Sequence, residues 1–246
     1  RSRLDSIANT TSKNILVVNL GCGFDPLPFQ LLDVENYGSR SYNKRFSFLD
    51  IDYADLIKRK TDMIRKDSAL MKIVGPETGG DATTFISQQY KVASCNLNHP
   101  HSFRELLQEE GLNDPNTIKV FIAEVSLAYM KPDHADKIIS LCSEMPLSHF
   151  LILEQLIPVG EHEPFSKRML KHFTKNDSPL LSVLQYRTKE SQRQRFSGLG
   201  FPSINVGDMY QLWLSVEPNT RSLIEEIEPF DELEEFQLFS HHYIIL

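Results

Sequence analysis

Short apolar runs recur along the first 155 residues and are separated by longer segments in which apolar and charged positions alternate. The runs cover residues 15–19, 46–51, 92–97, 118–123 and 149–153. Each is short and apolar enough to form a buried strand. The intervening stretches are long enough for crossover connections. This alternation predicts an α/β fold with a mainly parallel sheet.

The segments between the runs carry helical patterns. Residues 54–66 place apolar side chains among charges at the spacing of an amphipathic helix. A second helix is predicted through Phe103, Leu106 and Leu107, and a third from Pro132 to about Met145. Proline is well tolerated in the first turn of a helix, so Pro132 marks a plausible start. Residues 75–84 read as a polar loop.

The last third of the chain has a different pattern. Residues 158–200 are basic and helical, with breaks at Pro158, Pro164 and Pro179. Two further strands are predicted at 203–206 and 236–246, on either side of an acidic, helix-rich span. The prediction is therefore a Rossmann-like, seven-stranded, doubly wound sheet in which a terminal antiparallel strand is plausible.

Composition limits the class of protein. The chain has 246 residues, of which 41% are hydrophobic, and this fits one large α/β domain at 1–246. No run of about 18 apolar residues is present, so no membrane-spanning helix is expected. The chain starts at Arg1 within a helical pattern, which suggests a fragment.

The cysteines and histidines argue against a metal site. Cys22, Cys95 and Cys142 lie far apart and form no CxxC pair, which favours a reducing, cytoplasmic compartment. His241 and His242 are adjacent in a predicted strand, where neighbouring side chains face opposite sides. We therefore expect no metal.

The segment Asn19–Pro26 carries the strongest chemical signal. An apolar strand runs into Gly21-Cys22-Gly23 and then towards a helix, as in proteins that cradle a nucleotide-type cofactor. A dinucleotide-binding motif would have a third glycine where Pro26 stands. S-adenosylmethionine has no pyrophosphate and suits the shortened motif better. The alternative is a glycine turn that only reverses the chain.

Polar residues also end the next three strands of the predicted sheet. Because ligands of open parallel sheets bind at the carboxyl ends of the strands, these residues are candidate cofactor contacts. Asp50 and Asp52 lie at the end of the second strand, where alternate residues can share a face, and could accept hydrogen bonds from ribose hydroxyls. Asn96 and Leu97 could hold adenine. Glu124 could receive the ammonium group of the methionine part or the amino group of adenine. The alternative for each is an ordinary loop cap.

Charge is unevenly distributed along the chain. The net charge is −7, yet residues 165–195 contain eight basic and two acidic residues, about +6, which leaves about −13 elsewhere. Lys167, Arg168, Lys171 and Lys175 have the spacing of one helical face. This face is either an ordinary solvated surface or a binding site for a polyanion such as RNA.

Other catalytic classes lack their motifs. The chain contains no Gly-x-Ser-x-Gly nucleophile elbow and no GxxxxGK[ST] phosphate loop. We therefore expect neither a serine hydrolase nor a P-loop nucleotidase.

The motifs resemble those of a known family. VVNLGCGFDPLPFQLLD, FLDIDYADLIKRK, ASCNLN, IAEVSLAYM and FDELEEF occur in the order typical of leucine carboxyl methyltransferases, a branch of the class I S-adenosylmethionine-dependent methyltransferases. One branch of this family methylates the C-terminal leucine of the protein phosphatase 2A catalytic subunit. The other acts on a hypermodified guanosine beside the anticodon of phenylalanine tRNA, in wybutosine synthesis. EPFSKRML, NDSPLLSVLQY and VGDMYQLW are more similar to the second branch, especially its fungal form.

The resemblance implies S-adenosylmethionine as cofactor, held by Gly21, Asp52, Asn96 with Leu97, and Glu124. The family usually has Asp at the position of Asn96. It also uses an arginine of an Arg-Gly-Tyr segment that would lie upstream of Arg1. The tRNA-directed branch carries a C-terminal kelch-type propeller. By this resemblance the chain corresponds to a methyltransferase domain without the N-terminal lid and the propeller, and residues 158–200 are a basic helical insertion within it.

The implied reaction is methyl transfer to the α-carboxyl of the wybutosine precursor side chain, followed in the full-length enzyme by methoxycarbonylation of its α-amino group. A carboxylate is already ionised at neutral pH, so no general base is needed. Tyr129 is the candidate to orient the acceptor carboxylate, and its alternative role is that of an aromatic core residue. Two other functions stay open: methylation of the phosphatase C-terminus, and a non-catalytic domain that binds a cofactor or a partner.

Overall fold

The computed structural model of the chain describes residues 2–37, 43–227 and 233–245. The fold comprises two compact units. Unit 1 is formed by Arg1–Glu124 and Lys137–Leu151, and unit 2 by Val125–Asp136 and Ile152–Leu246. Both β7 (Ser148–Gln155) and α7 (Pro132–Ser143) begin in one unit and end in the other.

Unit 1 contains the parallel part of the sheet. Its strands are β1 (Asn14–Leu20), β2 (Phe46–Asp52), β3 (Gly79–Asp81), β4 (Thr84–Ile86), β5 (Tyr90–Ser94), β6 (Thr117–Glu124) and the first half of β7. They lie in the order β3-β4-β5-β2-β1-β6-β7. β1 is parallel to β2 and β6, and β2 is parallel to β5, whereas β3 and β4 are antiparallel.

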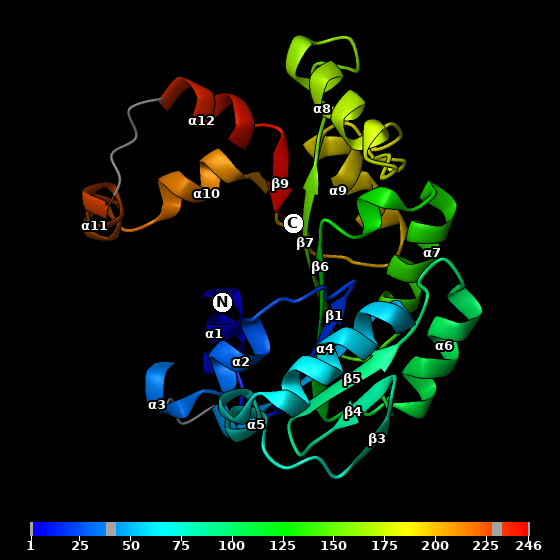
Figure 1. Cartoon of the computed structure of the whole chain (residues 1–246). Helices are drawn as coiled ribbons and strands as arrows, with labels where there is room; N and C mark the ends of the chain where they lie inside the picture. Colours follow the sequence, from blue (N-terminus) through cyan, green and yellow to red (C-terminus); the bar gives the residue numbers. More distant parts are fainter. Residues whose placement is uncertain (1, 38–42, 228–232, 246) are drawn as a thin grey trace. The chain divides into compact units, whose positions relative to one another are not determined.

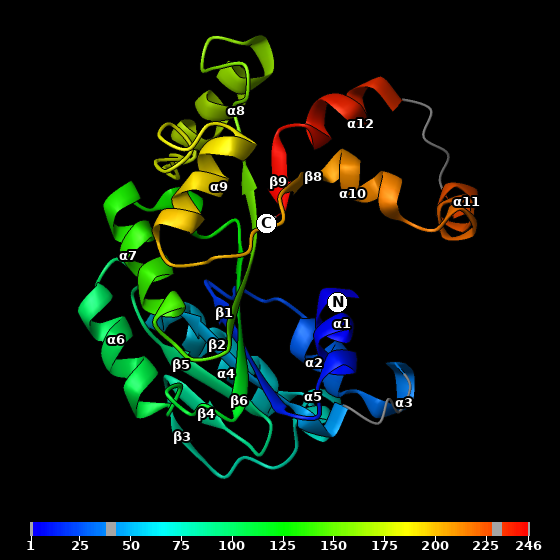
Figure 2. The same ribbon diagram turned by 180° about the vertical axis from the view of Figure 1, so that it is seen from behind.

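Helices cover both faces of this sheet. α1 (Ser2–Thr10), α2 (Leu27–Leu32), α4 (Ala54–Lys66) and α5 (Ser68–Val74) lie on one side, and α6 (Pro100–Glu109) lies on the other (Figures 1 and 2). The short helix α3 (Val34–Tyr37) and the 3-10 turn η1 (Asn43–Arg45) connect α2 to β2. The apolar side of α4 is buried through Ile57 and Ile64, which pack in one core with Val17, Phe48 and Phe85. Burial of these apolar side chains is the main favourable contribution to the folding free energy of unit 1.

Unit 2 contains the second half of β7, with β9 (Tyr243–Ile245) antiparallel to it and β8 (Gly207–Asp208) antiparallel to β9. Its helical segments are η2 (Leu127–Tyr129), α8 (Pro164–Lys175), α9 (Lys189–Gly198), α10 (Met209–Ser215), α11 (Pro218–Ile227) and α12 (Leu233–Ser240). A small core of Ala128, Ile157, Met169, Leu180 and Val183 joins η2 and α8 to the segment after β7.

The fold confirms the α/β class, the first five predicted strands and the terminal antiparallel strands, and it corrects three details. In the part of the chain that the structure describes, the sheet has nine strands, because a β3–β4 hairpin forms where residues 75–84 were expected to be a polar loop. Residues 203–206 are not a strand, since pairing with β9 begins only at Gly207. Of the strand predicted at 236–246, residues 236–240 are helical within α12 and Tyr243–Ile245 is extended, while residue 246 lies outside the described residues. In the described part of the chain, no helix has the length and apolarity needed to cross a membrane.

Candidate functional site

Four parallel strands of unit 1 end at the same edge of the sheet. The register aligns Leu20 with Ile51, Asp52 with Ser94, and Asn19 with Ile122. The segments that follow β1, β2, β5 and β6 therefore lie next to one another. This edge is the place where open α/β sheets bind ligands.

The turn after β1 is fixed by its backbone. The amides of Gly21 and Cys22 both donate to the Ile51 carbonyl, at 2.9 and 3.0 Å. Gly21 and Gly23 have φ angles of 74° and 49°, in the left-handed region that favours glycine. Any other residue type would strain the turn at these two positions, so the two glycines are required by its geometry.

Asp52 joins this turn to the end of β2. Its Oδ2 accepts the Gly23 amide at 2.9 Å, and its Oδ1 accepts the Tyr53 amide at 2.7 Å. The side chain is half-buried. A carboxylate has about four acceptor sites, so both oxygens keep capacity for further donors such as a pair of hydroxyls.

Asp50 lies elsewhere, although it is only two residues from Asp52. It is fully buried, and its Oδ2 accepts Lys60 Nζ at 2.6 Å and the Tyr90 hydroxyl at 2.7 Å. Burial raises the pKa of the Asp50 carboxyl, against the opposing effect of Lys60. Burial alone would lower the pKa of Lys60, but the Asp50 carboxylate raises it, so the ammonium stays charged. Asp50 is thus a structural partner of α4, and the structure does not bring it to the edge with Asp52.

Asn96 and Leu97 follow β5 at the same edge. Asn96 Oδ1 accepts the Asn98 amide at 2.9 Å, which forms a tight local turn and leaves the two donors of its amide NH₂ group available. Leu97 is buried, with 9% of its surface exposed. The Cys95 amide donates to the Asp52 carbonyl at 2.9 Å, which ties this loop to the end of β2.

Glu124 is the last residue of β6 and is exposed. Its position at the end of the strand next to β1 places it at the edge reached by the glycine turn. The structure therefore brings together Gly21, Gly23, Asp52, Asn96 and Glu124, with Leu97 beneath the loop.

Two supporting residues were not singled out by the sequence analysis. Asp25 Oδ2 accepts Asn19 Nδ2 at 2.8 Å, and Asp25 Oδ1 accepts the Leu27 amide at 2.9 Å. This pair braces the glycine turn against the first turn of α2. The signal was available, because an aspartate just before a helix often accepts the free amides of its first turn.

Tyr129 lies in unit 2, at the end of η2. Its ring packs against Phe173 with a centroid distance of 6.0 Å. The segment is held by Ser182, whose amide donates to the Ala128 carbonyl at 3.1 Å and whose Oγ donates to the Met130 carbonyl at 2.8 Å. Partial burial raises the pKa of Tyr129, so the hydroxyl remains a hydrogen-bond donor at neutral pH.

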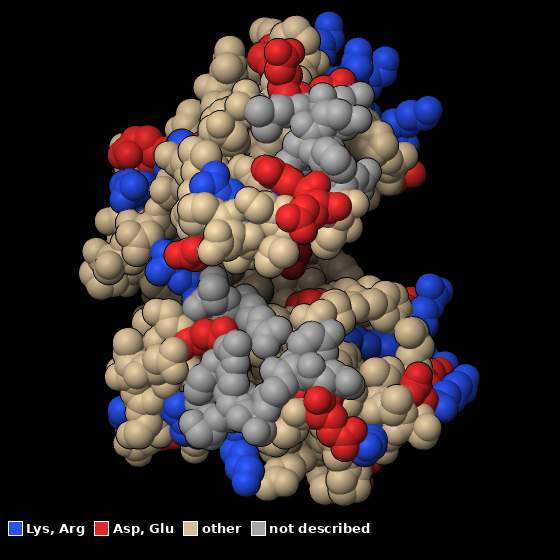
Figure 3. Space-filling view, turned by 90° about the vertical axis from the view of Figure 1, so that its left-hand side faces the viewer, with Lys and Arg blue, Asp and Glu red and all other residues tan. Residues whose placement is uncertain are grey.

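The helix α8 has one apolar and one basic face. Glu163 caps it by accepting the amides of Phe165 and Ser166 at 2.9 and 2.7 Å. Met169 is buried in the core of unit 2. The opposite positions are all exposed and make no ion pair within the described chain: Lys167, Arg168, Lys171 and Lys175. Figure 3 shows basic and acidic side chains interspersed on one face of the molecule.

The rest of the basic window does not extend this face. Arg195 donates to Asp136 at 2.7 Å and its side chain is fully buried. Ion pairs of 3.8, 2.9 and 3.6 Å occupy three more members of the window: Arg187 with Glu161, Lys189 with Asp208, and Arg193 with Glu190. The basic residues that give the predicted charge of about +6 therefore do not form one continuous surface. Among the described residues, the members of this window without an ion pair all lie on α8.

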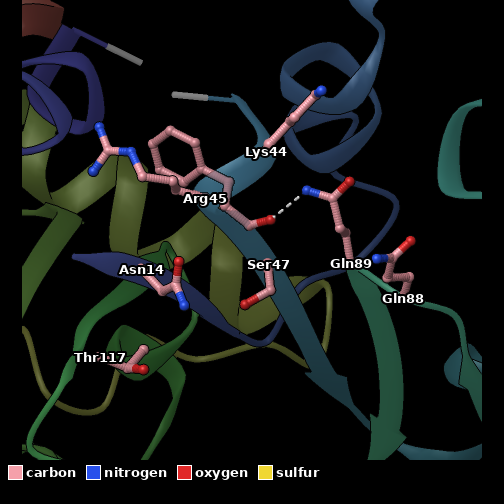
Figure 4. A pocket seen from close by; sticks show the side chains of 8 residues that line it. Asn14, Lys44, Arg45, Ser47, Gln88, Gln89 and Thr117 are labelled. Carbon is pink, nitrogen blue, oxygen red and sulfur yellow. Dashed lines mark hydrogen bonds between the residues drawn. The ribbon is translucent and has the colours of Figure 1, made fainter. Parts of the chain in front are cut away.

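A cavity of about 580 Å³ opens at the other edge of the unit 1 sheet. Figure 4 shows its polar lining at the amino ends of the strands, including Asn14, Ser47 and Thr117. Gln89 Nε2 donates to the Phe46 carbonyl at 2.8 Å across one wall. Ligands of parallel sheets bind at the carboxyl ends of the strands, so this cavity is not the candidate cofactor site.

The fold is that of the S-adenosylmethionine-dependent methyltransferases. A phosphoethanolamine N-methyltransferase of Haemonchus contortus aligns with a TM-score of 0.54 and 11% identity, over 99% of this chain and 51% of that one. A putative methyltransferase of Bacillus halodurans aligns with a TM-score of 0.50 and 10% identity, over 99% of this chain and 95% of that one.

The family follows from the sequence match. Residues 3–143 match the family model described as leucine carboxyl methyltransferase, and the chain belongs to this family. It is 53% identical to the tRNA wybutosine-synthesizing protein 4 of Candida glabrata over 245 residues, and 54% identical to that of Saccharomyces cerevisiae over 253 residues. All of this chain is covered in both matches, but only 36% of each relative. The chain thus spans about a third of the length of these relatives.

Proposed function

We propose that this chain is a carboxyl methyltransferase domain that transfers a methyl group from S-adenosylmethionine to a wybutosine precursor in tRNA. The observation that carries the proposal is the set of ligand-binding groups at the carboxyl edge of unit 1, with Asp52 joined to the glycine turn. Membership of the leucine carboxyl methyltransferase family supports the cofactor and the reaction class. The names of the relatives support the tRNA substrate.

The residues at this edge fit the cofactor. Gly21 and Gly23 allow close approach of a ligand to the backbone, and a Cβ placed on Gly23 would meet no atom within 4 Å. Asp52 suits the two ribose hydroxyls, because each of its oxygens already accepts one backbone amide and can accept another donor. Asn96 and Leu97 suit adenine, and Glu124 suits a positively charged amino group.

The chemistry requires little of the protein beyond positioning. When bound, S-adenosylmethionine supplies a methyl group on a positively charged sulfur. The acceptor carboxylate is ionised at neutral pH, so no residue has to remove a proton. Tyr129 would donate a hydrogen bond to that carboxylate and orient it, consistent with a hydroxyl that stays protonated. Alignment of the reacting groups and exclusion of water then account for most of the rate.

The tRNA contact is assigned to α8. Four exposed cations without ion pairs in the described chain, on one face of a capped helix, suit a row of phosphates: Lys167, Arg168, Lys171 and Lys175. We infer phenylalanine tRNA as the substrate, because the sequence resembles the branch of the family with that role. We infer a cytoplasmic location from the three cysteines, which form no CxxC pair. The resemblance further implies that the full-length enzyme methoxycarbonylates the α-amino group, and no residue described above accounts for that step.

Radiolabelled methyl transfer tests the proposal. Label from S-adenosylmethionine is expected in tRNA that carries the wybutosine precursor, and not in the phosphatase 2A catalytic subunit. Asp52→Ala is expected to weaken S-adenosylmethionine binding at least about tenfold by calorimetry, because it removes charge-assisted hydrogen bonds. Asp55→Ala is the matched control, since Asp55 is a nearby exposed carboxylate at the start of α4.

Each alternative predicts a different result. Label in the phosphatase rather than in tRNA would assign the chain to the other branch of the family. Cofactor binding without transfer to either acceptor would indicate a non-catalytic binding domain. Equal affinity of the wild type and Asp52→Ala would remove Asp52 from the site.

A further inference from the structure

Phe24 is an exposed aromatic residue at the candidate cofactor site. It directly follows Gly23, and 52% of its surface is exposed. Single exposed apolar residues are common and usually need no explanation. Phe24 differs from them because of the way in which its backbone is held.

The backbone on both sides of Phe24 is fixed by hydrogen bonds. Before it, the Gly23 amide donates to Asp52 at 2.9 Å. After it, the Asp25 amide donates to the Cys22 carbonyl at 3.0 Å, while the Asp25 side chain binds Asn19 and the Leu27 amide. The ring therefore projects from a turn that has little freedom. Preorganisation of this kind lowers the entropy cost of binding a ligand.

A second exposed aromatic residue is joined to the same hydrogen-bond network. Tyr53 is 54% exposed, and its amide donates to the same Asp52 carboxylate that accepts the Gly23 amide. Its hydroxyl accepts Asn98 Nδ2 at 3.2 Å, so its ring is also oriented. One carboxylate thus holds the backbone beside two exposed rings.

We propose that Phe24 is a stacking surface for the base of the substrate nucleoside. Phenylalanine has no polar group, so it recognises a ligand through its face and its area, and a planar fused-ring base offers both. The neighbouring carboxylates Asp25 and Asp52 disfavour a phosphate at this position, whereas a neutral base is compatible with them. This inference rests on the proposed function, because it requires a nucleic acid as the acceptor of the methyl group.

Substitution of Phe24 tests this role. Phe24→Ala is expected to raise the KM for tRNA by about 5- to 150-fold, the range that corresponds to the loss of one base–aromatic stack. Phe24→Trp should retain the affinity for tRNA, and Phe24→Leu should fall between the two, because leucine keeps apolar area without an aromatic face. The dissociation constant of S-adenosylmethionine and the melting temperature should change little in all three.

Met63→Ala is the matched control. Met63 lies in α4 of the same unit and is 53% exposed, so the substitution removes a similar amount of exposed apolar surface away from the site. Its KM for tRNA should equal that of the wild type. A loss of similar size in this variant would show that general surface changes, and not stacking, explain the effect.

A substrate without the base separates stacking from a structural role. The wild type and Phe24→Ala should bind tRNA with an abasic site at the target position equally weakly, because the partner of the ring is then missing. If Phe24→Ala weakens both substrates by the same factor, or weakens S-adenosylmethionine binding instead, the inference is overturned. A wild type that methylates tRNA and a Phe24→Ala variant that matches it overturn the inference alone. A wild type that transfers no methyl to tRNA overturns the proposed function, and this inference with it.

Discussion

At the scale of single residues, Glu154 has an unusual environment for a carboxyl group. It lies in the part of β7 that belongs to unit 2 and is fully buried. Arg195 Nη1 lies 3.8 Å from Glu154 Oε2, and Arg195 is held more closely by Asp136 at 2.7 Å. Burial raises the pKa of Glu154 to about 7, although Arg195 and Gln192 act in the opposite direction. Ionisation of Glu154 is therefore linked to the stability of unit 2.

Glu154→Gln is expected to flatten the pH dependence of stability. The pKa of Glu154 rises from 4.5 in the unfolded chain to about 7 in the folded one. The stability due to its protonated form is complete below pH 4.5 and is lost as the pH rises through about 7. This loss amounts to about 3 kcal/mol. Urea unfolding at pH 5, 6, 7 and 8 should show the variant gaining about this much relative to the wild type across the range.

The control for this prediction is Glu190→Gln in α9, which removes an exposed carboxylate from the same unit. Its difference from the wild type should not change between pH 5 and pH 8. A constant difference for Glu154→Gln as well would mean that Glu154 stays ionised in the folded protein, and the assigned coupling would be wrong.

The pair Asp50 and Asp52 shows which features of the candidate site can be predicted from single residues and which cannot. Both were predicted as ribose ligands because alternate residues of a strand share a face. The sequence predicts that the two side chains share one face of the strand, but it does not predict which helix packs against that face. Lys60 comes from α4, ten residues later in sequence, and its ammonium group reaches Asp50 at 2.6 Å and holds it in the core. Asp52 is not held in the core in this way, because it lies at the end of the strand, where the Gly23 amide of the glycine turn is its hydrogen-bond partner.

At the scale of elements, α8 has one face that packs in the core of unit 2 and another face that carries four exposed cations. Its apolar face packs through Met169 into the core, and its cap at Glu163 fixes the first turn. Neighbouring carboxylates do not neutralise its four cations within the described chain. Four positive charges on a rigid helix can displace counterions from a polyanion with little change in their own conformation.

Charge reversal on α8 should weaken tRNA binding in a salt-dependent manner. The triple change Lys167→Glu, Arg168→Glu, Lys171→Glu is expected to raise the KM for tRNA and to reduce the slope of log affinity against log salt by about 2 to 3. Filter binding between 50 and 200 mM salt measures this slope, about 0.7 to 0.9 being lost per phosphate contact.

The control carries the same change in charge on a different helix. Lys58→Glu, Arg59→Glu, Lys66→Glu reverses three exposed cations of α4. If both triple variants lose the same affinity, the effect comes from net charge and α8 is not the contact. If neither variant changes the salt slope, the tRNA is bound elsewhere on the protein.

Elements with a strong local pattern were predicted well, and those defined by a partner were not. The amphipathic pattern of 54–66 gave α4 with its observed bounds. The β3–β4 hairpin has almost no apolar alternation, and its pairing depends on β5, to which β4 is hydrogen-bonded. The apolar run 236–246 was predicted as one strand, but it changes from helix to strand. Phe236 and Phe239 have helical spacing and lie in α12, whereas residues 243–245 pair with β7. Long-range pairing of this kind cannot be read from local periodicity.

At the scale of the whole molecule, the candidate groups are divided between the two units. The proposed cofactor contacts Gly21, Asp52, Asn96 and Glu124 belong to unit 1. Tyr129 and the basic face of α8 belong to unit 2. The net charge of −7 is therefore a poor guide to nucleic-acid binding, because one exposed helix can carry the contact while acidic residues lie elsewhere.

This division predicts where the cofactor will protect the chain. Hydrogen exchange with saturating S-adenosylmethionine should slow at the turns after β1, β2 and β5, and the amides of α8 and α9 should change little. At a ligand concentration of 100 times the dissociation constant, the stabilisation of unit 1 should be about 2.7 kcal/mol.

Phe196→Ala removes a fully buried ring of α9 and should speed exchange in unit 2, at a cost of about 3–5 kcal/mol, while S-adenosylmethionine affinity stays within about twofold. Equal protection of α9 by the cofactor, or loss of cofactor binding in Phe196→Ala, would show that unit 2 takes part in cofactor binding.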